Sequence, residues 1–257
     1  MLARRTNSHK GENGRVLIVG GSDNYVGAPA LTGLAVLRSG ADLAIIACPE
    51  TAGYAINSIS PDLITVKLSG KTLARRHEPR IAKLAESADV VVLGPGLGTN
   101  PETKMTVRNL CRRISKPKVI DADALKALDK IPENCILTPH AGEFEILFGC
   151  KPTREELKKR ASEDKIILLK GPCDLISNGK EVKENCTGNP GMTVGGTGDV
   201  LAGLVAGLVA QGVKPLDAAF LAAQVNGESG DLLLKEKGYG FTASDLLEVI
   251  PRVMKEK

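Results

Sequence analysis

The sequence has no tryptophan, and aromatic residues make up only 3% of its 257 positions. Proteins that bind single-stranded nucleic acids stack the bases on aromatic side chains along a basic groove. Here Lys and Arg are dispersed, and the net charge is a mild +4. The longest uncharged apolar segment, residues 200–213, is shorter than the about 20 residues of a membrane helix. We therefore expect neither a nucleic-acid nor a membrane partner.

Cysteine occurs six times, but without a CxxC pair or the spacing of a zinc site or a disulfide scaffold. We therefore expect reduced, buried thiols. Residues 1–12 are basic and polar, and they lack the apolar core of a secretory signal peptide. Together these features predict a cytoplasmic protein.

The two common nucleotide-binding signatures are also missing. No GxxxxGK[ST] sequence occurs, and the GPGLG segment at Gly94–Gly98 does not match GxGxxG. A nucleotide that binds this protein therefore needs a different scaffold.

Short, fully apolar runs alternate with helical patterns along the whole chain. Strands that are apolar at every position are covered on both faces, which is typical of a parallel sheet between helices. The expected strands are 15–19, 42–48, 89–93, 118–121, 135–138, 165–169 and 174–176, and the expected helices include 28–39, 102–114 and 200–213. We predict one α/β domain over residues 1–257, a three-layer α/β/α sandwich with a mostly parallel central sheet.

Glycine and polar residues directly follow five of these strands. Ligands of open parallel sheets bind beyond the carboxyl ends of the strands, so these segments are expected to meet at one edge. The five segments are Gly20–Ser22, Gly94–Gly98, Asp121–Asp123, Thr138–Glu143 and Lys170–Pro172.

The segment Asn189–Asp199, with sequence NPGMTVGGTGD, leads into the apolar helix pattern. Glycines let backbone N–H groups approach an anion, and a helix N-terminus adds unpaired donors and a positive dipole end. Helix capping uses the same residue types, but it does not need an uncharged helix in which Gly203 and Gly207 each cost about 1 kcal/mol against alanine. Asp199 repels phosphate, yet it is suited to take a proton from a hydroxyl group beside one. The segment therefore predicts a phosphoryl-transfer site.

The sequence GGTGDVLAG at Gly195–Gly203 resembles the anion-hole motif of the ribokinase-like superfamily. Further motifs, in order along the chain, resemble the ADP- or ATP-dependent NAD(P)H-hydrate dehydratases. They are VGGS at 19–22 with YxGAP at 25–29, LGPGLG at 93–98, DADAL at 121–125 and LTPHAGEF at 137–144. The ordered set covers the chain from about Ser8 to its C-terminus and is specific, whereas GTGD alone indicates only the superfamily.

The resemblance implies a ribokinase-like fold and the repair of hydrated nicotinamide cofactors. The implied reaction is dehydration of (6S)-NADHX and (6S)-NADPHX, the hydrates of NADH and NADPH, with ADP as first and ATP as second choice of donor. The hydrate hydroxyl would be phosphorylated transiently, with release of AMP or ADP, and phosphate would then leave. Mg²⁺ is expected to bridge the nucleotide phosphates, because the sequence shows no dedicated metal cage.

Residue by residue, the resemblance implies two sets of contacts. The hydrated cofactor would contact Ala28, Gly98, His140 and Asp199, with Asp199 as the catalytic base. The nucleotide would contact Lys170, Gly171, Pro172, Cys173 and Asp174, and the backbone N–H groups of Gly195, Gly196, Thr197 and Gly198 would hold the transferred phosphoryl group.

Some of these residues have ordinary structural alternatives. A histidine after a strand can cap a helix, and Lys170 can cap the end of its strand. Asp121 and Asp123 either serve the site or cap the helix that follows. Cys173 replaces the small or hydroxylated residue expected from the family pattern, which leaves the choice of nucleotide open.

The resemblance also implies a homotetramer and a separate NAD(P)H-hydrate epimerase as functional partner, since we expect no epimerase domain in this chain. A ribokinase-like kinase that phosphorylates the hydroxymethyl group of a vitamin precursor is the alternative; it would release a stable phosphoester. A catalytically inactive nucleotide-binding module is a second alternative, but the presence of Asp199 argues against it.

Overall fold

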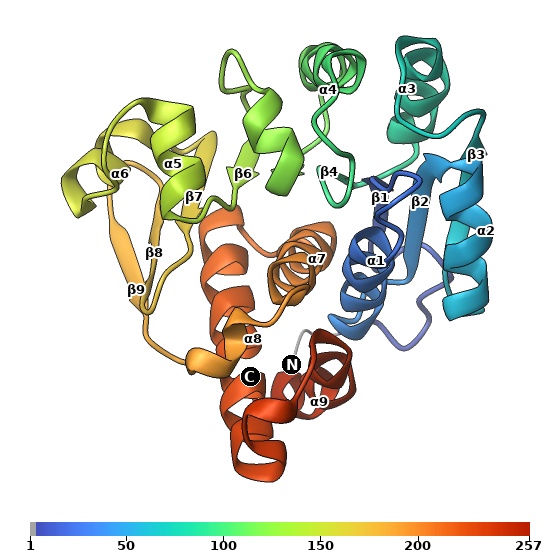
Figure 1. Cartoon of the computed structure of the whole chain (residues 1–257). Helices are drawn as coiled ribbons and strands as arrows, with labels where there is room; N and C mark the ends of the chain where they lie inside the picture. The colour runs from blue at the N-terminus through green and yellow to red at the C-terminus, as the bar shows by residue number, and fades with distance from the viewer. Residues whose placement is uncertain (1–3) are drawn as a thin grey trace.

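The computed structural model describes residues 4–257 and places a nine-stranded sheet between two layers of helices (Figure 1). The strand order is β3-β2-β1-β4-β5-β6-β7-β8-β9, in which the pairs β7–β8 and β8–β9 are antiparallel and the other pairs are parallel. The strands are β1 (Arg15–Val19), β2 (Leu43–Pro49), β3 (Ile64–Leu68), β4 (Val90–Leu93), β5 (Lys118–Ile120), β6 (Cys135–Leu137), β7 (Lys165–Leu169), β8 (Asp174–Ser177) and β9 (Val182–Asn185). The predicted mostly parallel α/β sandwich is confirmed.

Helices cover both faces of the sheet. The α-helices are α1 (Gly27–Arg38), α2 (Glu50–Ile59), α3 (Glu78–Glu86), α4 (Pro101–Arg113), α5 (Ala141–Phe148), α6 (Arg154–Arg160), α7 (Thr197–Ala210), α8 (Pro215–Lys237) and α9 (Ala243–Lys255). Short 3-10 helices are η1 (Arg75–His77), η2 (Ala122–Ala127), η3 (Pro190–Thr193) and η4 (Gly238–Gly240). None of the helices in residues 4–257 combines the length and the apolar character needed to cross a membrane.

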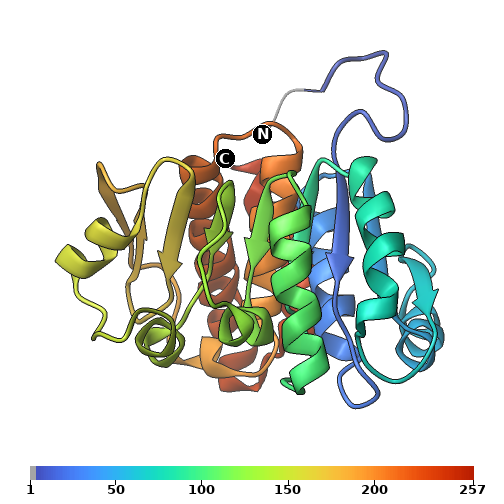
Figure 2. The ribbon, with the colours of Figure 1, turned by 90° about the horizontal axis from the view of Figure 1, so that it is seen from above.

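The two faces of the sheet form two separate cores. Side chains alternate between the faces of a strand, so Val16 and Ile18 join one cluster while Leu17 and Val19 join the other. The first cluster contains residues of α1, α7, α8 and α9, and the second contains residues of α3, α4, α5 and α6. Figure 2 looks onto the layer that contains α3 and α4, with the strands behind it and α7 and α8 behind the strands.

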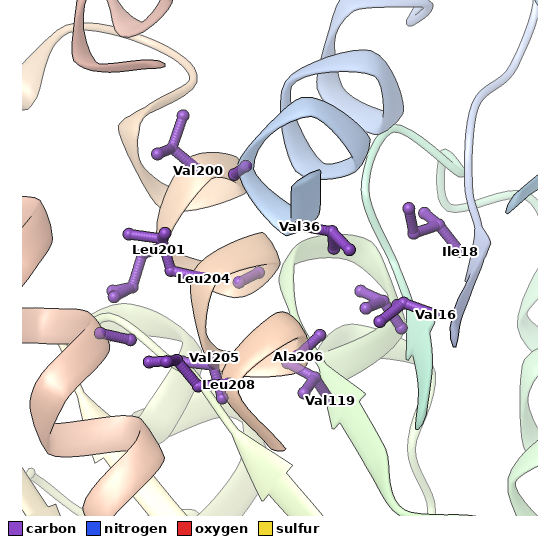
Figure 3. Packing of buried hydrophobic residues seen from close by; sticks show 14 of the residues in the cluster. Val16, Ile18, Val36, Val119, Val200, Leu201, Leu204, Val205, Ala206 and Leu208 are labelled. Atoms are coloured by element: carbon purple, nitrogen blue, oxygen red, sulfur yellow. The ribbon is translucent and has the colours of Figure 1, made fainter. Parts of the chain in front are cut away.

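Helix α7 lies at the centre of the first cluster and is buried from Val200 to Leu208, as its lack of charge predicts (Figure 3). It packs closely along α1. A Cβ atom at Gly203 would meet the carbonyl oxygen of Thr32, and a Cβ atom at Gly207 would meet the hydroxyl of Ser39. The two interior glycines therefore let the backbones of α1 and α7 approach each other, which sets where the N-terminus of α7 lies.

Two strands at the edges of the sheet, β3 and β9, are absent from the sequence-based expectation. Edge strands are partly exposed, so their sequences, ITVKL and VKEN, lack the continuous apolar character of the inner strands. A search for continuous apolar runs therefore does not distinguish strands that mix polar and apolar residues from loops.

The expectation of reduced thiols is wrong for Cys173 and Cys186, which form a disulfide. The other four cysteines are free, and three of them, Cys48, Cys111 and Cys135, are buried. Asp174 pairs with Asn185 across the β8–β9 hairpin, so the residues just outside that pair face each other. Because β9 is not evident in the sequence, the hairpin that brings the two thiols together is not evident either.

Candidate active site

The five polar segments that follow the inner strands lie at one edge of the sheet. Their strands β1, β4, β5, β6 and β7 are parallel neighbours, so their carboxyl ends point the same way. Backbone hydrogen bonds join the segments to one another: Gly21 N–H donates to Pro95 C=O at 2.7 Å, and Lys170 N–H donates to Pro139 C=O at 2.8 Å. The edge is therefore one continuous surface of loop backbone and polar side chains.

The N-terminus of α7 meets this surface. Gly196 precedes the helix with a φ of 100°, a left-handed conformation that favours glycine, and no side chain caps the helix. The first N–H groups of an α-helix have no acceptor within the helix. The Nζ atom of Lys170 lies 3.5 Å from where a Cβ atom at Gly198 would stand. Open N–H donors and an ammonium group thus face the same small space, as binding of a phosphate requires.

Asp199 lies half-buried in the first turn of α7. Desolvation raises the pKa of its carboxyl group to about 7, with a further rise from the negative charges of Asp121 and Asp123, while Lys170 opposes the rise. A carboxylate with a pKa near the pH of the cell is suited to general base catalysis. The geometry therefore gives Asp199 both the position and the basicity to accept a proton.

Asp121 and Lys170 form a shielded ion pair 3.0 Å long, in which the Asp121 side chain is 3% exposed. The same oxygen, Oδ1, accepts a hydrogen bond of 2.7 Å from the hydroxyl group of Thr138. Burial disfavours the charged form of Lys170, but the neighbouring carboxylates, above all Asp121, outweigh it and raise the pKa of the ammonium group. Asp121 precedes η2 without capping it through its side chain. Its carboxylate is thus directed to Lys170.

Asp123 also directs its carboxylate toward the site edge. Its Oδ2 atom accepts a hydrogen bond of 2.9 Å from the N–H of Gly98, and its Oδ1 atom accepts one of 3.1 Å from Lys126. Ala122, between the two aspartates, has a φ of 50°, which is costly for a residue with a side chain. This strained residue lies between the two aspartates that contact Lys170 and Gly98, and it carries no signal in the sequence.

Ala28 and Gly98, both expected to contact the hydrated cofactor, lie on neighbouring segments. Ala28 is in the first turn of α1, and its Cβ atom lies 3.4 Å from where a Cβ atom at Gly96 would stand. A Cβ atom at Gly98 would meet open space, although the φ of 74° there still favours glycine. The loop of Gly94–Gly98 and the start of α1 thus form one side of the candidate site.

His140 serves as a helix cap, the ordinary alternative for this residue. Its Nδ1 atom accepts a hydrogen bond of 3.2 Å from the N–H of Glu143, and the Glu143 carboxylate accepts one of 3.0 Å from the N–H of His140. This capping box begins α5. The His140 side chain is still 59% exposed. Capping therefore orients the ring, whose Nε2 atom lies 3.6 Å from Oε2 of Glu143, while most of the side chain stays exposed.

The segment Lys170–Asp174 is a tight turn between β7 and β8. Asp174 closes the turn by accepting a hydrogen bond of 3.1 Å from the N–H of Gly171, and Asn185 donates to the same carboxylate at 3.3 Å. Desolvation raises the pKa of Asp174 in spite of these bonds. Gly171 and Pro172 are exposed, and Cys173 is held by the disulfide. The turn thus presents backbone groups to solvent.

The glycine loop before α7 is held by its own side chains. The hydroxyl group of Thr197 lies 2.8 Å from the carbonyl oxygen of Met192 and donates into the loop. Within the segment 195–198, Thr197 therefore offers a ligand its backbone N–H group and not its hydroxyl. A Cβ atom at Gly195 would meet open space.

Comparisons with known proteins identify the family of the chain. A family model described as NAD(P)H-hydrate dehydratase matches residues 16–252. The chain is 50% identical over 266 residues to the bifunctional NAD(P)H-hydrate repair enzyme Nnr of Pyrobaculum aerophilum, a match covering 99% of this chain and 53% of that protein. It is 40% identical to the ADP-dependent (S)-NAD(P)H-hydrate dehydratase of Cenarchaeum symbiosum, covering 98% of this chain and 92% of that one. The chain thus spans about half the length of the bifunctional relatives.

Solved structures show the same fold. A ribokinase-like superfamily protein from Enterococcus faecalis has 26% identity and a TM-score of 0.87, covering 99% of this chain and 91% of that chain. An ADP/ATP-dependent NAD(P)H-hydrate dehydratase from Bacillus subtilis, co-crystallised with ATP and Mg²⁺, has 28% identity and a TM-score of 0.85, covering 100% and 94%. The expected ribokinase-like fold is confirmed, and the chain belongs to the NAD(P)H-hydrate dehydratase family.

Proposed function

We propose that this protein dehydrates (6S)-NADHX and (6S)-NADPHX to NADH and NADPH, with ADP as the phosphoryl donor and ATP as the second choice. One observation carries the proposal: Asp199 and the Lys170 ammonium group lie together at the uncapped N-terminus of α7. Membership of the dehydratase family supports it, as does the ADP-dependent relative from Cenarchaeum symbiosum.

The chemistry needs a proton acceptor next to a phosphate-binding site. Hydroxide is a poor leaving group, whereas phosphate leaves readily from a phosphate monoester. Asp199 takes the proton of the hydrate hydroxyl, whose oxygen then attacks the terminal phosphorus of the nucleotide and displaces AMP from ADP. Phosphate departs with the C–O bonding pair, and loss of a proton from the neighbouring ring carbon restores the double bond. The sum is hydrate plus ADP giving reduced cofactor, AMP and phosphate.

The chain's own groups stabilise the transferred phosphoryl group. The N–H groups at the start of α7 point toward the place where its charge is held, and Lys170 adds a positive charge beside Gly198. On the other side, Ala28, Gly98 and His140 would contact the hydrated ring system. The turn Lys170–Asp174 would contact the nucleotide through its exposed backbone.

Mg²⁺ would enter with the nucleotide and be held by phosphate oxygens, the kind of ligand that it prefers. Within residues 4–257, only Cys173, Glu184 and Cys186 bring three possible ligand atoms close together. Sulfur atoms do not suit Mg²⁺, so this group does not fit the ion. When bound with the nucleotide, Mg²⁺ would screen the charge of the phosphates, and Asp199 would carry out the proton transfer.

We further propose that residues 1–257 act as one catalytic domain in a homotetramer in the cytoplasm, where nicotinamide cofactors and adenine nucleotides are abundant. Several relatives are named bifunctional NAD(P)H-hydrate repair enzymes, and we propose NAD(P)H-hydrate epimerisation as the activity linked to that of this chain. A separate epimerase would supply the (6S) epimer from the (6R) form.

The experiment is a turnover assay with hydrated NADH and, in parallel, ADP or ATP. The absorbance of the reduced nicotinamide ring should recover, faster with ADP, and no phosphorylated pyridine nucleotide should persist. A stable phosphoester without recovery of NADH would contradict the proposal and indicate a kinase of small alcohols.

A further inference from the structure

We propose that Asp121 is a positioning residue that holds the Lys170 ammonium group against Gly198, at the start of α7, and keeps it from pairing with Asp199. The inference rests on the proposed function, which gives Asp199 the role of base. It assigns a task to a buried carboxylate whose side chain does not cap η2.

The first step is that Asp121 is fixed before any ligand binds. Its N–H donates to the carbonyl oxygen of Leu93 at 3.1 Å, and its carboxylate accepts from Thr138, which is fully buried. Gly94 has a φ of 134°, and a Cβ atom there would collide with the carbonyl oxygen of Asp121. Glycine at position 94 therefore lets β4 and the end of β5 approach closely enough to hold Asp121.

The second step is that two carboxylates compete for the Lys170 ammonium group. Asp121 binds it at 3.0 Å, while Asp199, across the site, also attracts it. The Lys170 side chain is 22% exposed, and its Nζ atom lies beside Gly198. An ammonium group paired with Asp199 would neutralise the base. Paired with Asp121, it remains beside the place of phosphoryl transfer while Asp199 stays available to accept a proton.

The third step concerns all charged groups around Asp199. Asp121, directly after β5, and Asp123, in η2, act on its charge, and so does Lys170, directly after β7. Glu143, from α5, and Asp174, from the start of β8, interact with Lys170 in turn. Removing the charge of Asp121 removes a repulsion from Asp199 and frees Lys170 to approach it. Both effects favour the carboxylate form, so both lower the pH at which Asp199 titrates.

The test compares Asp121→Asn with wild type in two measurements. Asparagine keeps the shape and still accepts the Thr138 hydrogen bond, but it lacks the charge. In a carboxyl-carbon NMR titration, the midpoint of Asp199 should fall by about one pH unit or more. In the turnover assay, kcat should fall about 10- to 100-fold, because Lys170 leaves the transferred phosphoryl group.

Two further variants separate positioning from charge. Asp123→Asn removes a neighbouring charge that does not bind Lys170, so it should lower the Asp199 midpoint by less than Asp121→Asn does. In a Lys170→Met background, Asp121→Asn should lower kcat by less than about twofold. Asp121 acts through Lys170, so the effects of the two substitutions are not additive. Multiplicative losses in the double variant would overturn the inference.

The titration requires no turnover, so the two proposals fail separately. If wild type does not convert the hydrate but Asp121→Asn shifts the Asp199 midpoint, the proposed function is wrong and the positioning of the charges stands. If wild type converts the hydrate and Asp121→Asn changes neither the midpoint nor kcat, the role of Asp121 is wrong.

Discussion

At the scale of single residues, the site depends on where a few charges lie in a partly buried space. Desolvation and two neighbouring carboxylates keep the proton of Asp199 bound up to nearly neutral pH, which suits the role of base that we propose for it. Lys170 moderates that effect without cancelling it, since its closest partner is Asp121. The same ammonium group lies beside the helix N-terminus where phosphate is expected.

Replacing Asp199 with Asn should remove turnover by several orders of magnitude while nucleotide binding survives. The amide cannot accept the hydroxyl proton, but it keeps the shape of the first turn of α7 and its N–H groups. Turnover assays and calorimetric titration with ADP check the two halves of this prediction. Near-normal turnover in Asp199→Asn would refute the assigned role.

For wild type, kcat/KM should rise with pH and level off above about 7, where Asp199 is deprotonated. The free enzyme needs the base form, so the rising limb reports its pKa. A rate profile measured from pH 5 to pH 9 checks this, with about one decade per pH unit expected on the acidic limb. A limb near pH 4 would show that Asp199 is not desolvated.

The same pKa affects stability. Between 3.8 and about 7 the native protein keeps a proton on Asp199 that the unfolded chain has lost. The raised pKa of Asp199 therefore stabilises the native state fully below pH 3.8, and this stabilisation is lost as the pH rises through about 7. Asparagine does not ionise, so Asp199→Asn avoids this loss. At pH 8 its free energy of unfolding should exceed that of the wild type by at most about 4 kcal/mol. Urea denaturation at pH 8 and pH 4 checks this; an equal advantage at both pH values would contradict it.

At the scale of elements, the position of α7 decides where its N-terminus points. The close approach of α7 to α1 requires Gly203 and Gly207. Gly196, which precedes α7, has a left-handed conformation that favours glycine. The Cys173–Cys186 bond joins the turn before β8 to the end of β9, on the chain that leads to the glycine loop.

Gly203→Ala should lower the free energy of unfolding by about 1–3 kcal/mol, although alanine favours helices. The added methyl group meets the Thr32 backbone carbonyl, which cannot rotate away as a side chain can. Gly240→Ala is the matched control, because a Cβ atom at Gly240 meets open space. Chemical denaturation measures both; equal effects in the two variants would contradict the close packing of α1 and α7.

Replacing Cys173 and Cys186 together with Ser should lower the free energy of unfolding by about 3 kcal/mol, since the bond closes a loop between residues 13 apart. Under denaturing, non-reducing conditions the wild type should show the four free cysteines and no more. Thiol titration checks the count, and six reactive thiols would mean that the bond does not form. The Cys111→Ser variant serves as control, because it removes a free thiol and leaves the disulfide intact.

At the scale of the whole molecule, the fold follows from the sequence more fully than the site does. The inner parallel strands are largely apolar, and glycine or polar residues follow them, so the parallel sheet and its polar edge are predictable. Edge strand β9 is polar, so the hairpin and the disulfide are not. The sequence allows His140 to cap a helix or to contact a ligand. Only the structure shows that His140 caps α5 while its ring stays exposed.

Asp121 shows most clearly what cannot be predicted from the sequence. Asp-Ala-Asp after a strand fits a cap and a site equally well, because the choice depends on the backbone of Ala122 and on Thr138 and Lys170, which are distant in sequence. Three-dimensional contacts of this kind leave no local pattern. The family resemblance implies the substrate positions, and the structure adds the charge arrangement from which we propose Asp199 as the base.

The central claim is that phosphorylation is a transient step toward elimination, with Asp199 as the base. The most direct measurement is the stoichiometry of products from (6S)-NADHX and ADP, determined for the wild type and for Asp199→Asn. The account predicts equal amounts of NADH, AMP and inorganic phosphate with the wild type, and none with the variant. AMP formed together with a lasting phosphorylated nucleotide, without NADH, would contradict it.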